Sequence, residues 1–259
     1  MSELVSDLSR PRGDYGFDGD YRVIPAPVVA AVYALICLAP AVFAVVKAVS
    51  GATTTAILSG AIALLLVFVG VSFLRLTRVG KFEAWARVLV GLRLRGDEHV
   101  LDLGCGRGAV LLAAAKLVPD GHATGIDLWR ADQTGNSPQS TRRNAESEGV
   151  ADRVSVRTGD MTCLPFDGDS FDLVVSSLAI HNIPKMAGRL AAIDEAARVL
   201  RPGGRLAVAD IAFTGRYAAR LRELGMTDVR RRSLGWRAWW GGPLLATRLV
   251  TASKPTAAP

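Results

Sequence analysis

The 259-residue chain has few of the residues that build disulfides and metal sites, with three cysteines and three histidines. Cys37, Cys105 and Cys163 lie far apart in the sequence, so we expect no disulfide framework and a reducing compartment. No pair of cysteines or histidines has the close spacing of a metal-binding motif, so we expect no metal site. Structural zinc folds and disulfide-rich secreted folds are therefore disfavoured.

Charged side chains are missing from two long stretches near the N-terminus, residues 24–46 and 48–74. Each stretch reaches the length of about 20 apolar residues that a membrane-spanning helix needs. A cleaved signal peptide has a shorter apolar region, and a second apolar run does not follow it so closely. A buried pair of soluble helices would carry polar residues on an outer face. The two stretches therefore predict a transmembrane helical hairpin, with a tight turn at Ser50 and Gly51.

Cations flank this hairpin unequally. Its two outer ends carry Arg10, Arg12, Arg22, Arg75, Arg78 and Lys81, whereas the turn is flanked only by Lys47. Because positive residues concentrate on the cytoplasmic side of spans, both termini and the globular part should face the cytoplasm. The sequence thus predicts a multi-pass membrane protein with two spans.

The formal net charge of +7 requires an explanation of its own. Arg230, Arg231 and Arg232 form the densest basic run, which admits nucleic acid as a partner. Consecutive residues of a strand point to opposite faces, so this run does not make one basic stripe. Arginines of a membrane protein more often face anionic lipid headgroups, so a membrane is favoured and nucleic acid is disfavoured.

Residues 100–115 read VLDLGCGRGAVLLAAA, an apolar strand, a glycine turn and the start of a helix. The turn has glycines at alternate positions: Gly104, Gly106 and Gly108. These glycines let the backbone pass close to a ligand. The spacing is one residue tighter than the Gly-x-Gly-x-x-Gly turn of dinucleotide sites. Asp102, just before the turn, suits a cation and would repel a pyrophosphate, which argues against a nicotinamide oxidoreductase.

Acidic residues end the next two predicted strands. Residues 123–126 lead into Asp127, about twenty residues past the glycines, where a carboxylate accepts from both hydroxyls of a ribose. Residues 154–158 lead into Gly159, Asp160 and Met161, a placement that suits a hydrogen bond to an adenine amine, with Met161 covering the ring. The ligand predicted by this order is an adenosine derivative.

The succession resembles the class I S-adenosylmethionine-dependent methyltransferases over about residues 97–253. The resemblance rests on the ordered segments DLGCGRG, GIDLW, GDMTCLPF, FDLVVSSLAIHNI and RVLRPGGRL. It implies an α/β fold with a doubly wound, seven-stranded, mostly parallel sheet, a C-terminal antiparallel hairpin strand, and here two preceding transmembrane α-helices. It also implies S-adenosylmethionine as the cofactor.

By the same resemblance, the cofactor-binding residues are Asp102, Gly104, Cys105, Gly106, Gly108, Asp127, Leu128, Asp160, Met161 and Ser177. Residues 176–182 then line the space between the methyl group and the acceptor. His181 is the only histidine in that segment and is the candidate catalytic base, since imidazole titrates near neutral pH. A purely shape-setting role for His181 is the alternative.

The predicted domain boundaries follow from these segments. They are a cytoplasmic tail (1–23), the transmembrane hairpin (24–74), a connecting amphipathic helix (75–96), the methyltransferase domain (97–254) and a short tail (255–259).

The connecting helix, residues 81–93, should pack antiparallel to the first strand, which would place the exit of the second span on the ligand side of the sheet. Three tryptophans, Trp236, Trp239 and Trp240, fall in the loop of the terminal hairpin on the same side. They predict either a platform at the headgroup level or a wall for an apolar substrate. Packing against a neighbouring helix is the alternative.

Together these features predict a membrane-anchored methyltransferase that transfers a methyl group in line to an apolar or lipid-derived small molecule, such as a quinone precursor. Two alternatives stay open: the same chemistry on a soluble substrate with the hairpin as a tether, and a non-catalytic membrane module that binds S-adenosylmethionine.

Overall fold

A seven-stranded sheet in the order β3-β2-β1-β4-β5-β7-β6 forms the centre of the computed structural model, which describes residues 2–18, 25–130, 133 and 135–256. The strands are β1 (His99–Leu103), β2 (His122–Asp127), β3 (Val154–Thr158), β4 (Phe171–Ser177), β5 (Leu200–Asp210), β6 (Thr227–Ser233) and β7 (Arg248–Ser253). The first five are parallel, and β7 is antiparallel to both β5 and β6. The predicted fold class is confirmed.

One strand is irregular near its start. β5 begins at Leu200, within the segment RVLRPGGRL. Leu200 pairs with Phe171, and the register then shifts so that Leu173 pairs with Arg205. The residues between form an irregularity within the strand, where Gly203 adopts a positive φ of 78°.

Helices cover both faces of the sheet because its strands are apolar on both sides, as in buried parallel sheets. Val100 of β1 packs in one core with α4 (Lys81–Leu92) and α5 (Ala109–Ala115). Leu101 of β1 packs in the other with α7 (Met186–Val199) and α8 (Thr214–Glu223). The sheet domain also contains α6 (Pro138–Glu148) and the short helices η2 (Ala151–Arg153), η3 (Ile180–Asn182), η4 (Trp236–Ala238) and η5 (Pro243–Leu245).

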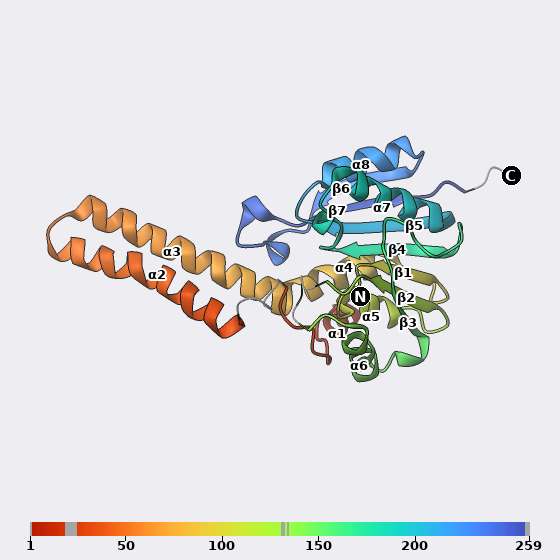
Figure 1. The fold of residues 1–259 in the computed structure, drawn as a ribbon, viewed down its shortest axis with the longest axis horizontal. Helices are drawn as coiled ribbons and strands as arrows, with labels where there is room; N and C mark the ends of the chain where they lie inside the picture. The colour runs from red at the N-terminus through yellow and green to blue at the C-terminus, as the bar shows by residue number, and fades with distance from the viewer. Residues whose placement is uncertain (1, 19–24, 131–132, 134, 257–259) are drawn as a thin grey trace.

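Two long apolar helices, α2 (Ala26–Val49) and α3 (Thr53–Arg75), pair with each other and project from the sheet domain (Figure 1). Both are long and apolar enough to cross a membrane. The turn between them falls at Ser50 and Gly51, as predicted, and Gly51 has a φ of 79°. The predicted start of the first span, Ile24, and the flanking Arg22 lie outside the described residues.

The second long helix continues into the sheet domain without a loop. A π-helical turn, η1 (Leu76–Gly80), joins α3 to α4, so helical structure runs unbroken from Thr53 to Leu92. The predicted connecting helix is confirmed as α4. Its first residues lie at the base of the helical hairpin (Figure 1).

The segment before the hairpin folds back onto the sheet domain. Residues 2–18, here called the N-terminal strap, begin with α1 (Ser2–Leu8), which packs against α4. Leu8 and Tyr15 are buried in the same core as Phe82, and the Tyr15 and Phe82 rings meet edge to face at 5.1 Å. The sequence interpretation of residues 1–23 as a tail did not foresee this packing.

Candidate functional site

A cavity of about 380 Å³ lies at the carboxyl ends of the parallel strands, the usual ligand position in such sheets. Of the eleven predicted site residues, ten line it: Asp102, Gly104, Cys105, Gly106, Asp127, Leu128, Asp160, Met161, Ser177 and His181. Gly108 is not among the lining residues. Its φ of 90° instead allows the backbone to enter α5, for which it is the N-cap.

The glycine turn passes tightly beneath the cavity. Gly104 and Gly106 have φ values of 71° and 51°, a backbone conformation that side chains disfavour. The N–H of Gly104 donates to the carbonyl of Ile126 at 2.8 Å, which fixes the turn to the end of β2. A Cβ at Gly104 would clash with Ala179, so larger residues would displace the neighbouring wall of the cavity.

Asp102 is a buried carboxyl at the floor of the cavity. Its Oδ1 atom has no hydrogen-bond partner among the described residues. Burial raises the pKa of Asp102 to about 8, and the nearby Asp127 adds to the rise. The free protein therefore holds Asp102 largely neutral at pH 7, and a bound cation would favour its carboxylate.

Asp127 lies at the end of β2 and holds the turn from the other side. Its Oδ2 accepts from the N–H of Gly106 at 2.8 Å, and its Oδ1 accepts from the N–H of Trp129 at 2.6 Å. Burial raises its pKa, and these hydrogen bonds oppose the rise. Asp160, beyond β3, accepts from the N–H of Thr162 at 2.8 Å.

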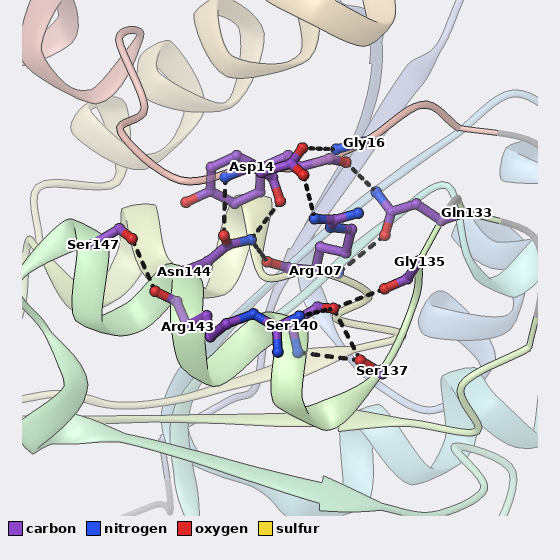
Figure 2. A network of polar contacts seen from close by, with 11 residues as sticks. Asp14, Gly16, Arg107, Gln133, Gly135, Ser137, Ser140, Arg143, Asn144 and Ser147 are labelled. Atoms are coloured by element: carbon purple, nitrogen blue, oxygen red, sulfur yellow. Dashed lines mark hydrogen bonds and ion pairs between the residues drawn. The ribbon is translucent and has the colours of Figure 1, made fainter.

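Gln133 joins the N-terminal strap to the glycine turn. Its Oε1 accepts from the N–H of Arg107 at 3.0 Å, and its Nε2 donates to the Tyr15 carbonyl at 3.1 Å and to Asp18 at 3.3 Å. Figure 2 shows Gln133 between Arg107 and the strap. Asp18 in turn pairs with Lys81 at 3.1 Å, and both residues line the cavity. The strap therefore closes one end of the cavity with polar groups.

Two buried side chains of α6 fasten the strap further. Asn144 accepts from the N–H of Asp14 and donates to its carbonyl, both at 2.9 Å (Figure 2). Glu148 Oε1 accepts from the N–H groups of Arg12 and Gly13 and from the Tyr15 hydroxyl, at 2.7, 3.0 and 2.9 Å. These contacts span more than a hundred residues of sequence, so no local motif reveals them.

His181 lines the cavity beside a fully buried carboxylate. Its Nδ1 lies 2.6 Å from Asp210 Oδ1, at ion-pair distance without the alignment of a hydrogen bond. Asp210 Oδ2 also accepts from the backbone N–H of His181 at 3.0 Å and from the Tyr217 hydroxyl at 3.4 Å. Sequence reasoning missed Asp210, although an acidic residue at the end of β5 must lie beside the segment that follows β4.

The first turn of α4 supplies the apolar side of the cavity. Phe82 and Trp85 line it, and the Trp85 indole donates to the Ser177 hydroxyl at 2.8 Å. The exit of the long helix α3 thus lies on the ligand side of the sheet. This agrees with the placement predicted from the antiparallel packing of the connecting helix.

The loop between β6 and β7 completes the cavity. Residues 236–245, here called the tryptophan loop, pack against α3: the Trp239 ring lies 6.5 Å from Phe68, and the Trp240 ring 5.3 Å from Phe73. Trp240 also lines the cavity, and its buried indole N–H has no hydrogen-bond partner among the described residues. The tryptophan loop therefore contacts both α3 and the cavity.

Comparisons with known proteins agree with this geometry. Residues 100–204 match a methyltransferase-domain family. The fold is similar to that of an S-adenosylmethionine-dependent methyltransferase from Aquifex aeolicus, with a TM-score of 0.52, 19% identity, and coverage of 65% of this chain and 88% of that one. Residues 100–204 are therefore a methyltransferase domain, and the sheet around them has the fold of the class I S-adenosylmethionine-dependent methyltransferases.

Curated relatives match about half of this chain with higher identity. Methyltransferase GfsG of Streptomyces halstedii is 40% identical over 124 residues, which cover 48% of this chain and 41% of the relative. The ubiquinone/menaquinone biosynthesis C-methyltransferase UbiE of Roseobacter denitrificans is 34% identical over 135 residues, covering 52% and 51%. The chain spans about half the length of the curated relatives it matches.

The residues of the methyltransferase domain fit S-adenosylmethionine. The unpartnered oxygen of Asp102 suits the cofactor's ammonium group, and Asp127 has lone pairs left for ribose hydroxyls. Gly104 and Gly106 line the cavity, where a Cβ at either position would push against Ala179 or Gln133. Among the described residues, no group of three or more His, Cys, Asp or Glu side chains could hold a metal ion.

Proposed function

We propose that the protein is a membrane-anchored methyltransferase whose acceptor is an apolar or lipid-derived small molecule. The observation that carries the proposal is the position of the cavity at the base of the helical hairpin. Phe82 and Trp85 of α4 and Trp240 of the tryptophan loop line it, and Trp240 packs on Phe73 of α3. An apolar acceptor leaving a bilayer along α3 would meet this wall first.

The exposure of the helical hairpin supports membrane anchoring. Most apolar side chains of α2 and α3 face away from the protein, and Leu64 is 74% exposed. The core helix of a soluble protein would bury such residues, whereas a spanning helix presents them to lipid. With cations at its outer ends, the hairpin would place both termini and the methyltransferase domain on the cytoplasmic side.

The names of two relatives point to the same class of acceptor. The Roseobacter denitrificans relative is named for ubiquinone and menaquinone biosynthesis, and one from Symbiobacterium thermophilum is a demethylmenaquinone methyltransferase. Because the matches cover about half of each relative, they favour a quinone precursor as the acceptor of this protein without defining it.

The cofactor supplies an electrophilic methyl group on a sulfonium, so the protein's main contribution is to hold the acceptor in line. In the proposed reaction, the carbon–sulfur bond would break with its electrons left on sulfur as the acceptor atom bonds to the methyl carbon, and His181 Nε2 would take the proton that the acceptor atom loses. Asp210 faces Nδ1, the opposite ring nitrogen, and its carboxylate stabilises the imidazolium that forms. Asp210 is thus a positioning residue, and His181 the base.

Incubation of the full chain with bacterial membranes and methyl-labelled S-adenosylmethionine tests this proposal. We expect label to appear in a small product that partitions into organic solvent, and mass spectrometry identifies the acceptor. The His181→Ala protein is the matched control, since it should bind the cofactor and transfer little label.

Label found only in a water-soluble product would contradict the apolar acceptor and leave the hairpin as a tether. Cofactor binding without label in any fraction would contradict the enzymatic function and favour a non-catalytic binding module.

A further inference from the structure

The tryptophan loop carries three features that methyl transfer itself does not require: it packs along a candidate span, it exposes large apolar side chains, and it has cations at its base. We propose that residues 236–245 enter the bilayer beside α3 and form a third membrane-contacting element. The proposal rests on the proposed function, because it takes α3 to be a membrane span.

The contacts of the loop fix its depth along α3. Trp239 faces Phe68, and a Cβ at Gly241 would lie 2.9 Å from Val69 Cγ1. Phe68 precedes Arg75, the last residue of α3, by seven positions. At about 1.5 Å per residue, that is about 10 Å along the helix axis. If Arg75 lies at the headgroups, the loop reaches the level of the acyl chains.

The outer surface of the loop is apolar. Leu244 is 98% exposed, Leu245 is 57% exposed and Trp236 is 51% exposed. Leaving such side chains in water costs free energy that insertion into lipid would recover. These side chains lie on the same side of the protein as α3. A single bilayer would therefore cover both α3 and the loop.

The base of the loop has the chemistry of the headgroup layer. The guanidinium groups of Arg75 and Arg237 lie over the Trp236 ring, at 4.2 and 4.5 Å from its centre. Both cations also pair with Glu83, at 2.9 and 3.0 Å. Tryptophan and arginine together are typical of the boundary between lipid and water, where indoles and snorkelling cations are stable.

Several backbone groups of the loop are paired within the loop or with its flanking residues, which lowers the cost of their entry into lipid. The N–H of Trp240 donates to the carbonyl of Leu245 at 3.0 Å, and that of Thr247 to Ala238 at 2.9 Å. The N–H of Leu245 donates to Gly242 at 3.3 Å. Glycines at 241 and 242, with φ values of 82° and 142°, allow these tight turns.

A spin label at position 244 measures insertion directly. The full chain is reconstituted in vesicles of phosphatidylcholine and phosphatidylglycerol, in a Cys163→Ser background that keeps the buried Cys105. Leu244→Cys, with Cys37→Ser, places the label at the tip of the loop. Leu224→Cys, also with Cys37→Ser, is the matched control because this exposed leucine lies between α8 and β6, at the end of β6 away from the tryptophan loop. Native Cys37 of α2 reports the hairpin.

We expect the label at 244, like that at Cys37, to collide with oxygen several-fold more than with a polar nickel chelate, and the label at 224 to show the reverse. Oxygen preference at Cys37 but not at 244 would overturn the loop proposal and leave the membrane anchor standing. Nickel preference at both would overturn the anchor and the loop proposal together. Protection of 244 from both reagents would mean a protein partner or a second copy covers the loop, which also contradicts insertion.

Discussion

The two segments that cover the cavity have opposite chemistry. The N-terminal strap lies over the glycine turn and is held by hydrogen bonds and ion pairs, among them Gln133 with Asp18 and Arg107 with Asp14. The tryptophan loop lies toward α3 and is held by aromatic contacts with Phe68 and Phe73. The cofactor end therefore has a polar cover and the proposed acceptor end an apolar one.

This difference matches the two ligands. S-adenosylmethionine is charged and comes from water, so polar groups that pair with it and with one another suit its end of the cavity. An apolar acceptor is stabilised by aromatic surface, and an apolar wall next to a span shortens its path from the bilayer. If this division holds, changes at one cover should alter the binding of one ligand and spare the other.

Removal of the proposed base should have the largest effect. His181→Ala should lower kcat by about 100-fold or more, the usual contribution of a general base. Because the predicted cofactor contacts come from Asp102, Asp127 and Asp160 rather than from the His181 imidazole, the affinity for S-adenosylhomocysteine should stay the same. Steady-state kinetics and calorimetry measure the two quantities, and an equal loss in both would show that the ends of the cavity are not separate.

The protonation of Asp102 should make cofactor binding depend on pH. Below pH 8 the free protein holds Asp102 neutral, and a bound ammonium group favours the carboxylate, so binding releases a proton. Affinity for S-adenosylhomocysteine should therefore fall about tenfold per pH unit as the pH drops below 8. Calorimetry in buffers of different ionisation enthalpy measures the released proton.

Asp102→Asn is the control for this pH dependence, since it should bind more weakly and lose the proton release. If Asp102 acts on the cofactor alone, the acceptor KM of the Asp102→Asn protein should have the same pH profile as that of the wild-type protein. Proton uptake, or a flat profile in the wild-type protein, would contradict the assignment.

Loosening the strap should weaken the cofactor and spare the acceptor. Glu148→Gln replaces charge-assisted hydrogen bonds to Arg12, Gly13 and Tyr15 by neutral ones, at a cost of about 1 kcal/mol. Cofactor affinity should fall by up to about fivefold. Glu146→Gln, on the exposed face of the same helix, is the matched control and should leave it unchanged. A rise in the acceptor KM of the Glu148→Gln protein would contradict the separation of the two covers, because the strap would then affect acceptor binding as well.

A conservative change in the tryptophan loop should give the smallest and most selective effect. Trp240→Phe keeps an aromatic ring against Phe73 and removes the unpartnered indole N–H from the cavity. The acceptor KM should rise about threefold, within the free energy that such an aromatic contact supplies. Cofactor affinity measured by calorimetry should not change, and a loss there would place Trp240 at the wrong end of the cavity.

The sequence predicted those parts of the fold whose causes are local. The apolar run before Gly104 marks β1, and residues 154–158 match β3 because alternation and a following turn define them. Asp127 and Asp160 were predicted from their positions directly after the second and third strands, and both line the cavity. The family resemblance added Ser177 and His181, which also line the cavity.

The parts that the sequence did not reveal depend on distant partners. Nothing near Asp14 in the chain predicts its bonds to Asn144, which lies 130 positions away. Gln133 falls in a polar loop whose position over the glycine turn depends on that same strap. Gly108 was predicted to bind the cofactor because it shares the motif of Gly104. In the structure it is the N-cap of α5 and is not among the residues that line the cavity.

Surface dilution in proteoliposomes tests most directly whether the acceptor comes from the bilayer. The amounts of the full chain and of an apolar quinone precursor are held constant while inert lipid is added. If the acceptor reaches the cavity along α3, the methylation rate should fall as the mole fraction of acceptor in the bilayer falls, at unchanged bulk concentration. A rate that follows the bulk concentration and ignores added lipid would contradict a cavity supplied from the membrane.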